Sequence, residues 1–495
     1  MTKLIFPKNK SEVDRYYREA KAGNIKRIRQ GIYTDAPDDD IPKVIENKWF
    51  EIVDYLYPSA IASHSTAYHL RPINGVVYIT APVKQRKKLS IADMLTIEVL
   101  PGNVDCLTEP FVPCLFRSNT ARYLLENLQT SHDSVQAVKT LGKEWAEKEL
   151  CKLLDKYGED EINHIRDTAN VHAQTLNLEK QAVILDSLIG AILSTRPIEN
   201  LRSPLAIAHA KKKPFDNNRI GLFKSFADYL MKCHFNPVSY SYNTSSWRNL
   251  SFYESYFSNY IEGTEFEIDE AEKIVFEKAV INNRHEDSHD VLSVFDIVND
   301  YTEMVTLPDS PEELISILKQ RHAIILHERQ GKYPGKLKTK ANKAGDTLFV
   351  LPEHVEGTLT HSFDIYQSLP KGLHRAIFMQ FWISECHPFD DGNGRLARIM
   401  MNSELVATEQ HKIIVPTVHR DSYLNGLRHA TRSGKFRTIT KVFAGLQAYT
   451  ASIDWLDYGE ARETLELHMA DKLPDQGVAV FNKQLSKYKL ELPVG

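Results

Sequence analysis

Apolar residues recur at helical spacing on both sides of a short stretch rich in polar residues and glycine, residues 387–395. The apolar positions are Leu373, Ile377, Phe378, Phe381 and Trp382 before the stretch, and Leu396, Ile399, Met400 and Leu405 after it. Repeats of three and four residues place side chains on one face of a helix. We therefore predict two buried helices joined by a polar loop.

The first part of the chain has a mixed pattern. Residues 11–22 favour a helix, whereas residues 25–34 and 75–80 favour strands. A mainly helical stretch then follows at residues 135–194. These patterns predict an α+β module at the N-terminal end of the chain.

A boundary is expected near residue 200, because proline and a basic run at residues 194–214 interrupt the helical period. We therefore expect a module at residues 1–200, a second domain at 215–450 and a C-terminal tail at 451–495. The tail has no chemical motif. The expected fold class is mainly α, with an all-helical second domain that carries a small β-hairpin.

Composition limits the class of protein. The chain has 495 residues, 61 Lys and Arg against 65 Asp and Glu, and ordinary hydrophobic content, so more than one domain is expected. No apolar stretch approaches membrane-spanning length, and the first residues lack the apolar core of a signal peptide. The five cysteines follow no metal-ligand spacing, which fits a reducing compartment. We predict a cytoplasmic protein with no membrane partner.

The polar loop combines side chains that could handle a nucleotide. His387 could accept a proton near neutral pH, and Asp391 is the type of hard ligand that Mg²⁺ prefers. A glycine-rich turn at a helix N-terminus forms a nest for phosphate, and nearby guanidiniums can neutralise its charge. The residues of the nest and its arginines are Gly392, Asn393, Gly394, Arg395 and Arg398.

The whole string matches His-x-Phe-x-Asp/Glu-Gly-Asn-Gly/Lys-Arg-x-x-Arg, so this region resembles the Fic family. A Fic domain is all-helical and typically transfers AMP from ATP to a Ser, Thr or Tyr hydroxyl of a target protein. The resemblance implies ATP as substrate, Mg²⁺ as cofactor, His387 as general base, Asp391 as metal ligand and Arg398 as γ-phosphate ligand. Gly394 indicates AMP transfer, because family members that transfer phosphate carry Lys there.

An aromatic-rich helical segment at residues 251–263 resembles the inhibitory helix of Fic proteins, Ser/Thr-x-x-x-Glu-Gly/Asn. Ser258 and Glu262 are four residues apart and share a helical face, while Gly263 suits a left-handed helix end. The resemblance implies that Glu262 pairs with Arg398 and blocks the γ-phosphate position. Its place before the active-site loop resembles the intramolecular arrangement, class II.

A short strand follows a basic, turn-rich segment at residues 331–345. The resemblance implies that this strand belongs to a flap, which covers adenine and pairs with the target backbone. An aromatic residue farther along the chain also lies where the family places one near adenine. The strand residues are Thr347, Leu348, Phe349 and Val350, and the aromatic residue is Tyr423.

The N-terminal module has a local positive charge. Residues 1–33 contain nine Lys and Arg against three Asp and Glu, a net charge of +6. The segment also resembles the regulator fold of AbiEi-type antitoxins, with residues 28–33 as the wing of a winged helix. Lys26, Arg27 and Arg29 are therefore candidates for contact with DNA or a protein partner.

Three functional hypotheses follow. The first is a self-inhibited protein adenylyltransferase, whose target is another protein or the chain itself. The second is a transcriptional regulator in which ATP acts on the Fic-like domain as a switch. The third is removal of AMP from modified targets, with Glu262 positioning a water. A homodimer is compatible with each of them, and the sequence names neither the target nor the signal that frees the helix.

Overall fold

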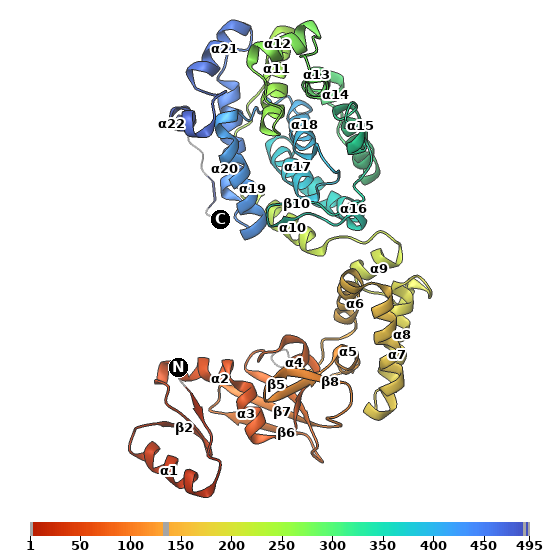
Figure 1. Cartoon of the computed structure of the whole chain (residues 1–495), viewed down its shortest axis with the longest axis vertical. Helices are drawn as coiled ribbons and strands as arrows, with labels where there is room; N and C mark the ends of the chain where they lie inside the picture. Colours follow the sequence, from red (N-terminus) through yellow and green to blue (C-terminus); the bar gives the residue numbers. More distant parts are fainter. Residues whose placement is uncertain (1–2, 132–137, 489–491, 494–495) are drawn as a thin grey trace. The chain divides into compact units, whose positions relative to one another are not determined.

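The computed structural model describes residues 3–131, 138–488 and 492–493. The chain forms two compact units, Met1–Lys212 and Lys213–Gly495 (Figure 1). The first unit is α+β and the second is helical apart from one small hairpin, which confirms the predicted fold class. Within the described ranges, no helix is long and apolar enough to cross a membrane.

The first unit begins with a small three-stranded sheet. Strands β1 (Leu4–Ile5), β2 (Lys26–Arg29) and β3 (Ile32–Thr34) pair antiparallel in the order β1-β3-β2, and helix α1 (Lys10–Lys21) lies between β1 and β2 in sequence. The prediction of one strand over residues 25–34 was wrong. Gly31 adopts a φ of 78°, which turns the chain back on itself.

A six-stranded mixed sheet forms the centre of the first unit. Strand β5 is the strand predicted at residues 75–80, and it pairs parallel with β7. Apolar residues of the sheet share a core with helices α2 (Ile41–Asn47) and α3 (Trp49–Leu56). The strand order is β6-β7-β5-β4-β9-β8, and the bounds are β4 Ile61–Ala62, β5 Val76–Ala81, β6 Lys87–Ile91, β7 Leu95–Pro101, β8 Thr108–Val112 and β9 Leu115–Ser118.

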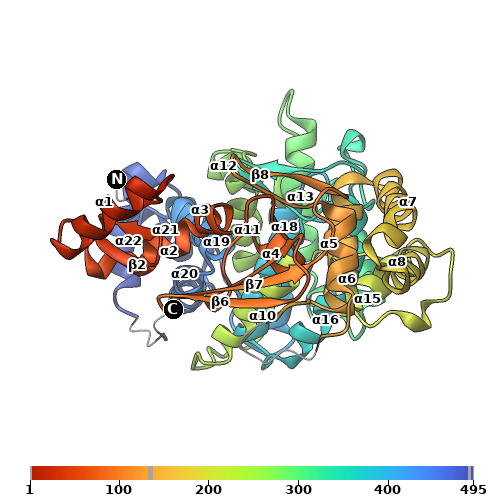
Figure 2. The same cartoon turned by 90° about the horizontal axis from the view of Figure 1, so that it is seen from below.

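Helices complete the first unit and account for the helical stretch predicted at residues 135–194. Its first positions, 135–137, lie outside the described residues. Figures 1 and 2 both show α7 and α8 side by side. The helices are α4 His64–His69, α5 Thr120–Asn127, α6 Lys143–Tyr157, α7 Glu159–Leu176, α8 Glu179–Ile192 and α9 Pro204–Ala210, with 3₁₀ turns at Asp38–Asp40 and Ile198–Asn200.

The second unit packs its helices around a central pair, α17 and α18. The nine apolar residues that predicted these two helices are all 4% exposed or less, so the pair forms the middle of the core. The helices are α10 Asn217–Leu230, α11 Thr244–Ile261, α12 Ile268–Glu277, α13 His285–Asn299, α14 Tyr301–Met304, α15 Pro311–Ile325, α16 Pro352–Ser368, α17 Leu373–Cys386, α18 Asn393–Val406, α19 Arg420–Ser433, α20 Arg437–Ala451, α21 Tyr458–Leu467 and α22 Pro474–Leu485.

Smaller elements of the second unit lie between these helices. Strands β10 (Lys343–Ala344) and β11 (Thr347–Leu348) form an antiparallel hairpin, and 3₁₀ turns lie at Gln330–Lys332 and Thr417–His419. The C-terminal segment packs into the same core through Trp455 and Phe481, which are 3% and 0% exposed. The described part of residues 451–495 therefore belongs to the second unit.

Candidate active site

The loop between α17 and α18 is shaped by two residues with left-handed backbone. His387 ends α17 with a φ of 47°, and Gly392 caps α18 with a φ of 72°. A Cβ on Gly392 would also meet the Leu326 side chain at 3.2 Å. Glycine is therefore favoured at 392, because both the backbone and the neighbouring side chain disfavour a larger residue.

The Asn393 side chain holds this loop from within. Its Oδ1 accepts a hydrogen bond from the Phe389 N–H at 2.9 Å, and its Nδ2 donates to the Phe389 carbonyl at 2.8 Å. The side chain is buried and satisfied inside the loop. A role of Asn393 in nucleotide binding would therefore use its backbone.

His387 faces a cavity with its imidazole neutral. The ring stacks on Phe349 with 3.8 Å between centroids, and Nδ1 lies 3.2 Å from the Ser384 carbonyl. Because a carbonyl only accepts, Nδ1 carries the proton and Nε2 keeps its lone pair. Burial lowers the pKa of His387 to about 4, which differs from the near-neutral titration expected of an unshifted histidine.

His322 of α15 supports the same loop, and sequence reasoning missed it. Its Nδ1 accepts a hydrogen bond from the Gly335 N–H at 2.9 Å, so its Nε2 is protonated and donates to the Asp391 carbonyl at 3.1 Å. The ring also stacks on Phe389 at 3.8 Å, and burial lowers the pKa of His322 to about 4. No sequence pattern marks it, because the contact joins residues far apart in the chain.

Asp391 presents an ionised carboxylate at the start of α18. Burial raises its pKa, but the hydrogen bond from the Gly392 N–H and the charges of Arg395 and Lys332 outweigh burial and hold that pKa below the ordinary value. The Gly392 N–H donates to Oδ1 at 2.7 Å, and Lys332 Nζ lies 3.4 Å from Oδ2. A half-exposed carboxylate of this kind fits Mg²⁺, which binds proteins through one or two carboxylates together with phosphates and waters.

Arg398 is held by the end of α11. Its Nε donates to Ser258 Oγ at 3.0 Å, and its Nη2 donates to the Ser258 carbonyl at 2.8 Å and to Glu262 Oε1 at 2.7 Å. Its Nη1 donates to the Tyr423 hydroxyl at 3.3 Å. Burial lowers the pKa of Arg398, but the Glu262 carboxylate more than offsets burial and raises that pKa above the ordinary value.

The Glu262 carboxylate lies over the N-terminal turn of α18. Glu262 is the C-cap of α11, and Gly263 follows it with a φ of 92°. A Cβ on Gly394 would meet Glu262 Oε1 at 2.1 Å. The carboxylate therefore occupies the position at which a helix N-terminus favours an anion.

Arg395 is paired with a buried acid, Asp290. Its Nη1 lies 2.7 Å from Asp290 Oδ2 and donates to Asn259 Oδ1 at 3.3 Å. Asp290 is also paired with Arg329, at 2.9 Å. The structure therefore places Arg395 in an ion-pair network within the protein, whereas the sequence grouped it with the nucleotide ligands.

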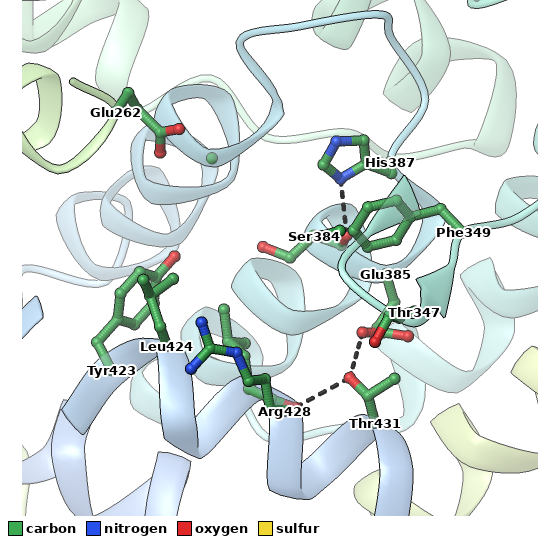
Figure 3. Close-up of a pocket in the computed structure, with 13 residues that line it drawn as sticks. Glu262, Thr347, Phe349, Ser384, Glu385, His387, Tyr423, Leu424, Arg428 and Thr431 are labelled. Carbon is green, nitrogen blue, oxygen red and sulfur yellow. Dashed lines mark hydrogen bonds between the residues drawn. The ribbon is translucent and has the colours of Figure 1, made fainter. Parts of the chain in front are cut away.

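A cavity of about 250 Å³ brings six of the predicted site residues together: Glu262, Thr347, Phe349, His387, Gly394 and Tyr423. Figure 3 shows Glu262 pointing into it from the side opposite Phe349, with Arg428 and Thr431 contributed by α19. Of the seven lining residues that sequence reasoning missed, four lie on α19, which carries no motif of its own. The lining residues are Glu262, Ala344, Thr347, Phe349, Ser384, Glu385, His387, Gly394, Tyr423, Leu424, Leu427, Arg428 and Thr431.

Comparison with known sequences agrees with this site. Residues 314–405, which contain His322, the loop and all of α18 except its last residue, match the Fic/DOC family. The chain contains a Fic domain.

A protein adenylyltransferase Fic from Nematostella vectensis is 25% identical over 228 residues, 44% of this chain and 53% of the relative. Another, from Aedes aegypti, is 28% identical over 107 residues, 22% of this chain and 21% of the relative. The chain thus spans about half or less of these relatives.

Solved structures similar to the chain also include Fic proteins. Fic-1 (residues 134–508) from C. elegans is 17% identical with a TM-score of 0.38, covering 66% of this chain and 90% of that one. A Fic-domain signalling protein from Bacteroides thetaiotaomicron is 17% identical with a TM-score of 0.37, covering 49% of this chain and 97% of that one.

The hairpin of the Fic domain is shorter than the predicted strand, because β11 contains only Thr347 and Leu348. Two arginines hold it: Arg219 donates to the Leu348 carbonyl at 2.7 Å, and Arg432 donates to Thr347 Oγ1 at 3.3 Å. Phe349 leaves the strand to stack on His387, and Val350 is fully buried in the core. Val350 is therefore not placed to contact adenine or a target strand.

The basic segment of the first unit is partly neutralised. Lys26 Nζ lies 2.6 Å from Asp38, and Arg29 donates to the Ser90 carbonyl at 2.7 Å, whereas Arg27 is exposed. Within residues 3–34, the single helix α1 precedes the β2–β3 hairpin, so this range contains no helix-turn-helix. Binding of DNA or a protein partner through this segment stays a prediction.

Proposed function

We propose that the protein is a self-inhibited adenylyltransferase of the Fic type, which transfers AMP from ATP to a hydroxyl of a target protein. One observation carries the proposal: the Arg398 guanidinium is held by Glu262 at the edge of the cavity that His387 lines. The Fic/DOC match and the names of the relatives support the same chemistry.

Each group around the cavity has a defined task in this proposal. The triphosphate lies at the N-terminus of α18, where the helix dipole and Arg398 favour negative charge. His387 Nε2 accepts the proton of the target hydroxyl, whose oxygen attacks the α-phosphorus, and pyrophosphate leaves. Asp391 would hold Mg²⁺ beside the phosphates, where the ion supplies charge neutralisation. Tyr423 and the hairpin residue Thr347 line the remaining space, where the nucleoside would lie.

Inhibition follows from competition between two anions for one cation. While Glu262 holds Arg398 and covers Gly394, a γ-phosphate cannot take the same position. A bias of a few kcal/mol toward Glu262 hides roughly 99% of productive ATP binding. Glu262→Gly should therefore raise AMP transfer by tens- to hundreds-fold.

Two labels of ATP test the proposal on the full-length protein. With Mg²⁺ present, the Glu262→Gly variant should incorporate label from α-³²P-ATP into itself or lysate proteins, but no label from γ-³²P-ATP. Chelation of Mg²⁺, or Asp391→Ala in the same background, should abolish incorporation. Incorporation of the γ label would indicate phosphate transfer instead, and an unchanged rate in Glu262→Gly would remove Glu262 from the regulation.

Removal of AMP from targets is a second candidate, because Glu262 and His387 line the same cavity and Glu262 could orient a water there. Protein labelled by the Glu262→Gly variant provides the substrate. Release of AMP by the parent chain, but not by Glu262→Gly, would favour this activity. Retention of the label would leave transfer as the function.

A further inference from the structure

Three potential metal ligands converge in the Fic domain, outside the cavity. His289 lies on α13, and His327 and Glu328 follow the C-terminal end of α15. Their ligand atoms all lie within 4.8 Å of one another. Because α13 and α15 pack against each other, the cluster joins two separate segments of the chain.

A third histidine, His285, lies beside this cluster. It lies one turn before His289 on α13, and residues four apart share a helical face. Its Nδ1 is 3.9 Å from Glu328 Oε2. Glu328 therefore lies between His285 and the two other histidines of the cluster.

The burial and exposure of these side chains also suit metal binding. His289 Nδ1 is buried and makes no hydrogen bond to the described residues, and an unsatisfied buried nitrogen is costly. The His327 and Glu328 side chains are 69% and 36% exposed, so an ion could reach them from solvent. His327 Nδ1 and Glu328 Oε1 already lie 3.2 Å apart.

We propose that His289, His327 and Glu328, with His285 as a fourth ligand, bind a transition-metal ion of the Zn²⁺ class. Imidazole nitrogens with a carboxylate suit Zn²⁺, Co²⁺ or Ni²⁺, whereas Mg²⁺ prefers oxygen ligands. Zinc bonds of about 2.0–2.1 Å require ligand atoms roughly 3.3–3.5 Å apart, so the exposed side chains close slightly around the ion.

The bound ion would also stabilise the ion pairs that connect α13 to α18, the helix that follows the loop at residues 387–392. Asp290 follows His289 and Arg329 follows Glu328, and these two residues form an ion pair at 2.9 Å. Asp290 also pairs with Arg395 of α18. Metal binding would therefore hold α13 and the segment after α15 together. These two segments also carry Asp290 and Arg329, and Asp290 holds Arg395 in place.

Zinc binding to the metal-free, full-length protein tests the proposal. Titration with Zn²⁺ against a competing chelator, in excess Mg²⁺ to fill oxygen-rich sites, should show one ion per chain. Separate His289→Ala and His327→Ala variants should each weaken binding at least tenfold, since even outer-shell changes cost about 10–100-fold. The matched control is His164→Ala, which removes an exposed histidine of α7 and should leave binding unchanged.

A second readout does not depend on titration. Zn²⁺ should raise the unfolding temperature of the parent and of His164→Ala, but not of His327→Ala, because an ion that binds only the folded state stabilises it. His327 is largely exposed, so this variant should fold even if His289→Ala does not. Absence of Zn²⁺ binding by the parent, or equal binding by His327→Ala, would overturn the proposal.

Discussion

Arg395 and Arg398 lie one turn apart on α18 and are both nearly inaccessible, yet their surroundings differ. Arg395 is paired with Asp290, whose side chain is 1% exposed and also faces Arg329. Arg398 is paired with Glu262, whose side chain is 31% exposed and borders the cavity. A fully buried acid cannot leave its partner without a large penalty, whereas a half-exposed acid can move into water.

In the proposed mechanism, this difference separates a structural arginine, Arg395, from one that can exchange its partner, Arg398. The Asp290 region supports the fold, because three elements meet at one carboxylate: α13, the segment after α15, and α18. In the Glu262 region, the carboxylate lies where an incoming phosphate is favoured, over Gly394. Two identical side chains on one helix therefore acquire different roles from the acids that face them.

The largest expected effect tests whether AMP transfer takes place in the cavity beside Arg398, where His387 lies. In the Glu262→Gly background, His387→Ala should lower AMP transfer by about 10²–10⁴-fold, because a positioned general base is lost. Incorporation of α-³²P label measures the rate, and ATP binding by calorimetry provides the control, since it should remain. Near-normal transfer would exclude His387 as the base.

The comparison of the two arginines can be measured directly. In the same background, Arg398→Ala should return transfer to the level of the inhibited parent, a loss of tens- to hundreds-fold. Arg395→Ala should act mainly through stability, so its loss per folded molecule should stay below about tenfold. Equal losses per folded molecule would show that both arginines contact the phosphates, as the sequence suggested.

Removing the acid beside Arg395 should destabilise the protein more than removing the acid beside Arg398, the reverse of the order expected for activity. Asp290→Ala leaves Arg395 and Arg329 without their shared acid and should reduce the free energy of unfolding by about 3–5 kcal/mol. Glu262→Ala should cost about 1 kcal/mol or less, because solvent screens a half-exposed carboxylate. Urea unfolding of both variants beside the parent gives the values. A larger loss in Glu262→Ala would reverse the assignment of the two regions.

The sequence predicted the central helices well because their apolar residues repeat at helical spacing and are buried on all sides in α17 and α18. It could not identify Asp290 or His322, since their roles arise from contacts across the fold and neither belongs to a motif. The six-stranded sheet was largely missed too. Several of its strands are short, and β4 has only two residues, too few for a period to be recognised.

The smallest expected effect concerns pH. The guanidinium of Arg398 stays charged at any physiological pH, and the pKa of Asp391 lies below its ordinary value because the Gly392 hydrogen bond and the charges of Arg395 and Lys332 outweigh burial. The pH dependence of AMP transfer should therefore follow the protonation of His387. Burial lowers the pKa of His387 to about 4, and the neutral form is the base in the proposed mechanism, so that form is already available above about pH 5.

The kcat/KM for AMP transfer by Glu262→Gly should therefore change less than about twofold between pH 6 and pH 8, and should fall only as the pH approaches 4. This ratio reports the free enzyme, whose His387 the structure describes. An unshifted histidine, with a pKa of about 6.5, would instead lose roughly fourfold from pH 8 to pH 6. Saturating Mg²⁺ keeps the form of ATP constant, and circular dichroism at each pH checks that the protein stays folded. A fourfold loss with intact fold would mean that His387 is hydrated in solution, and that the Phe349 stack does not shield it.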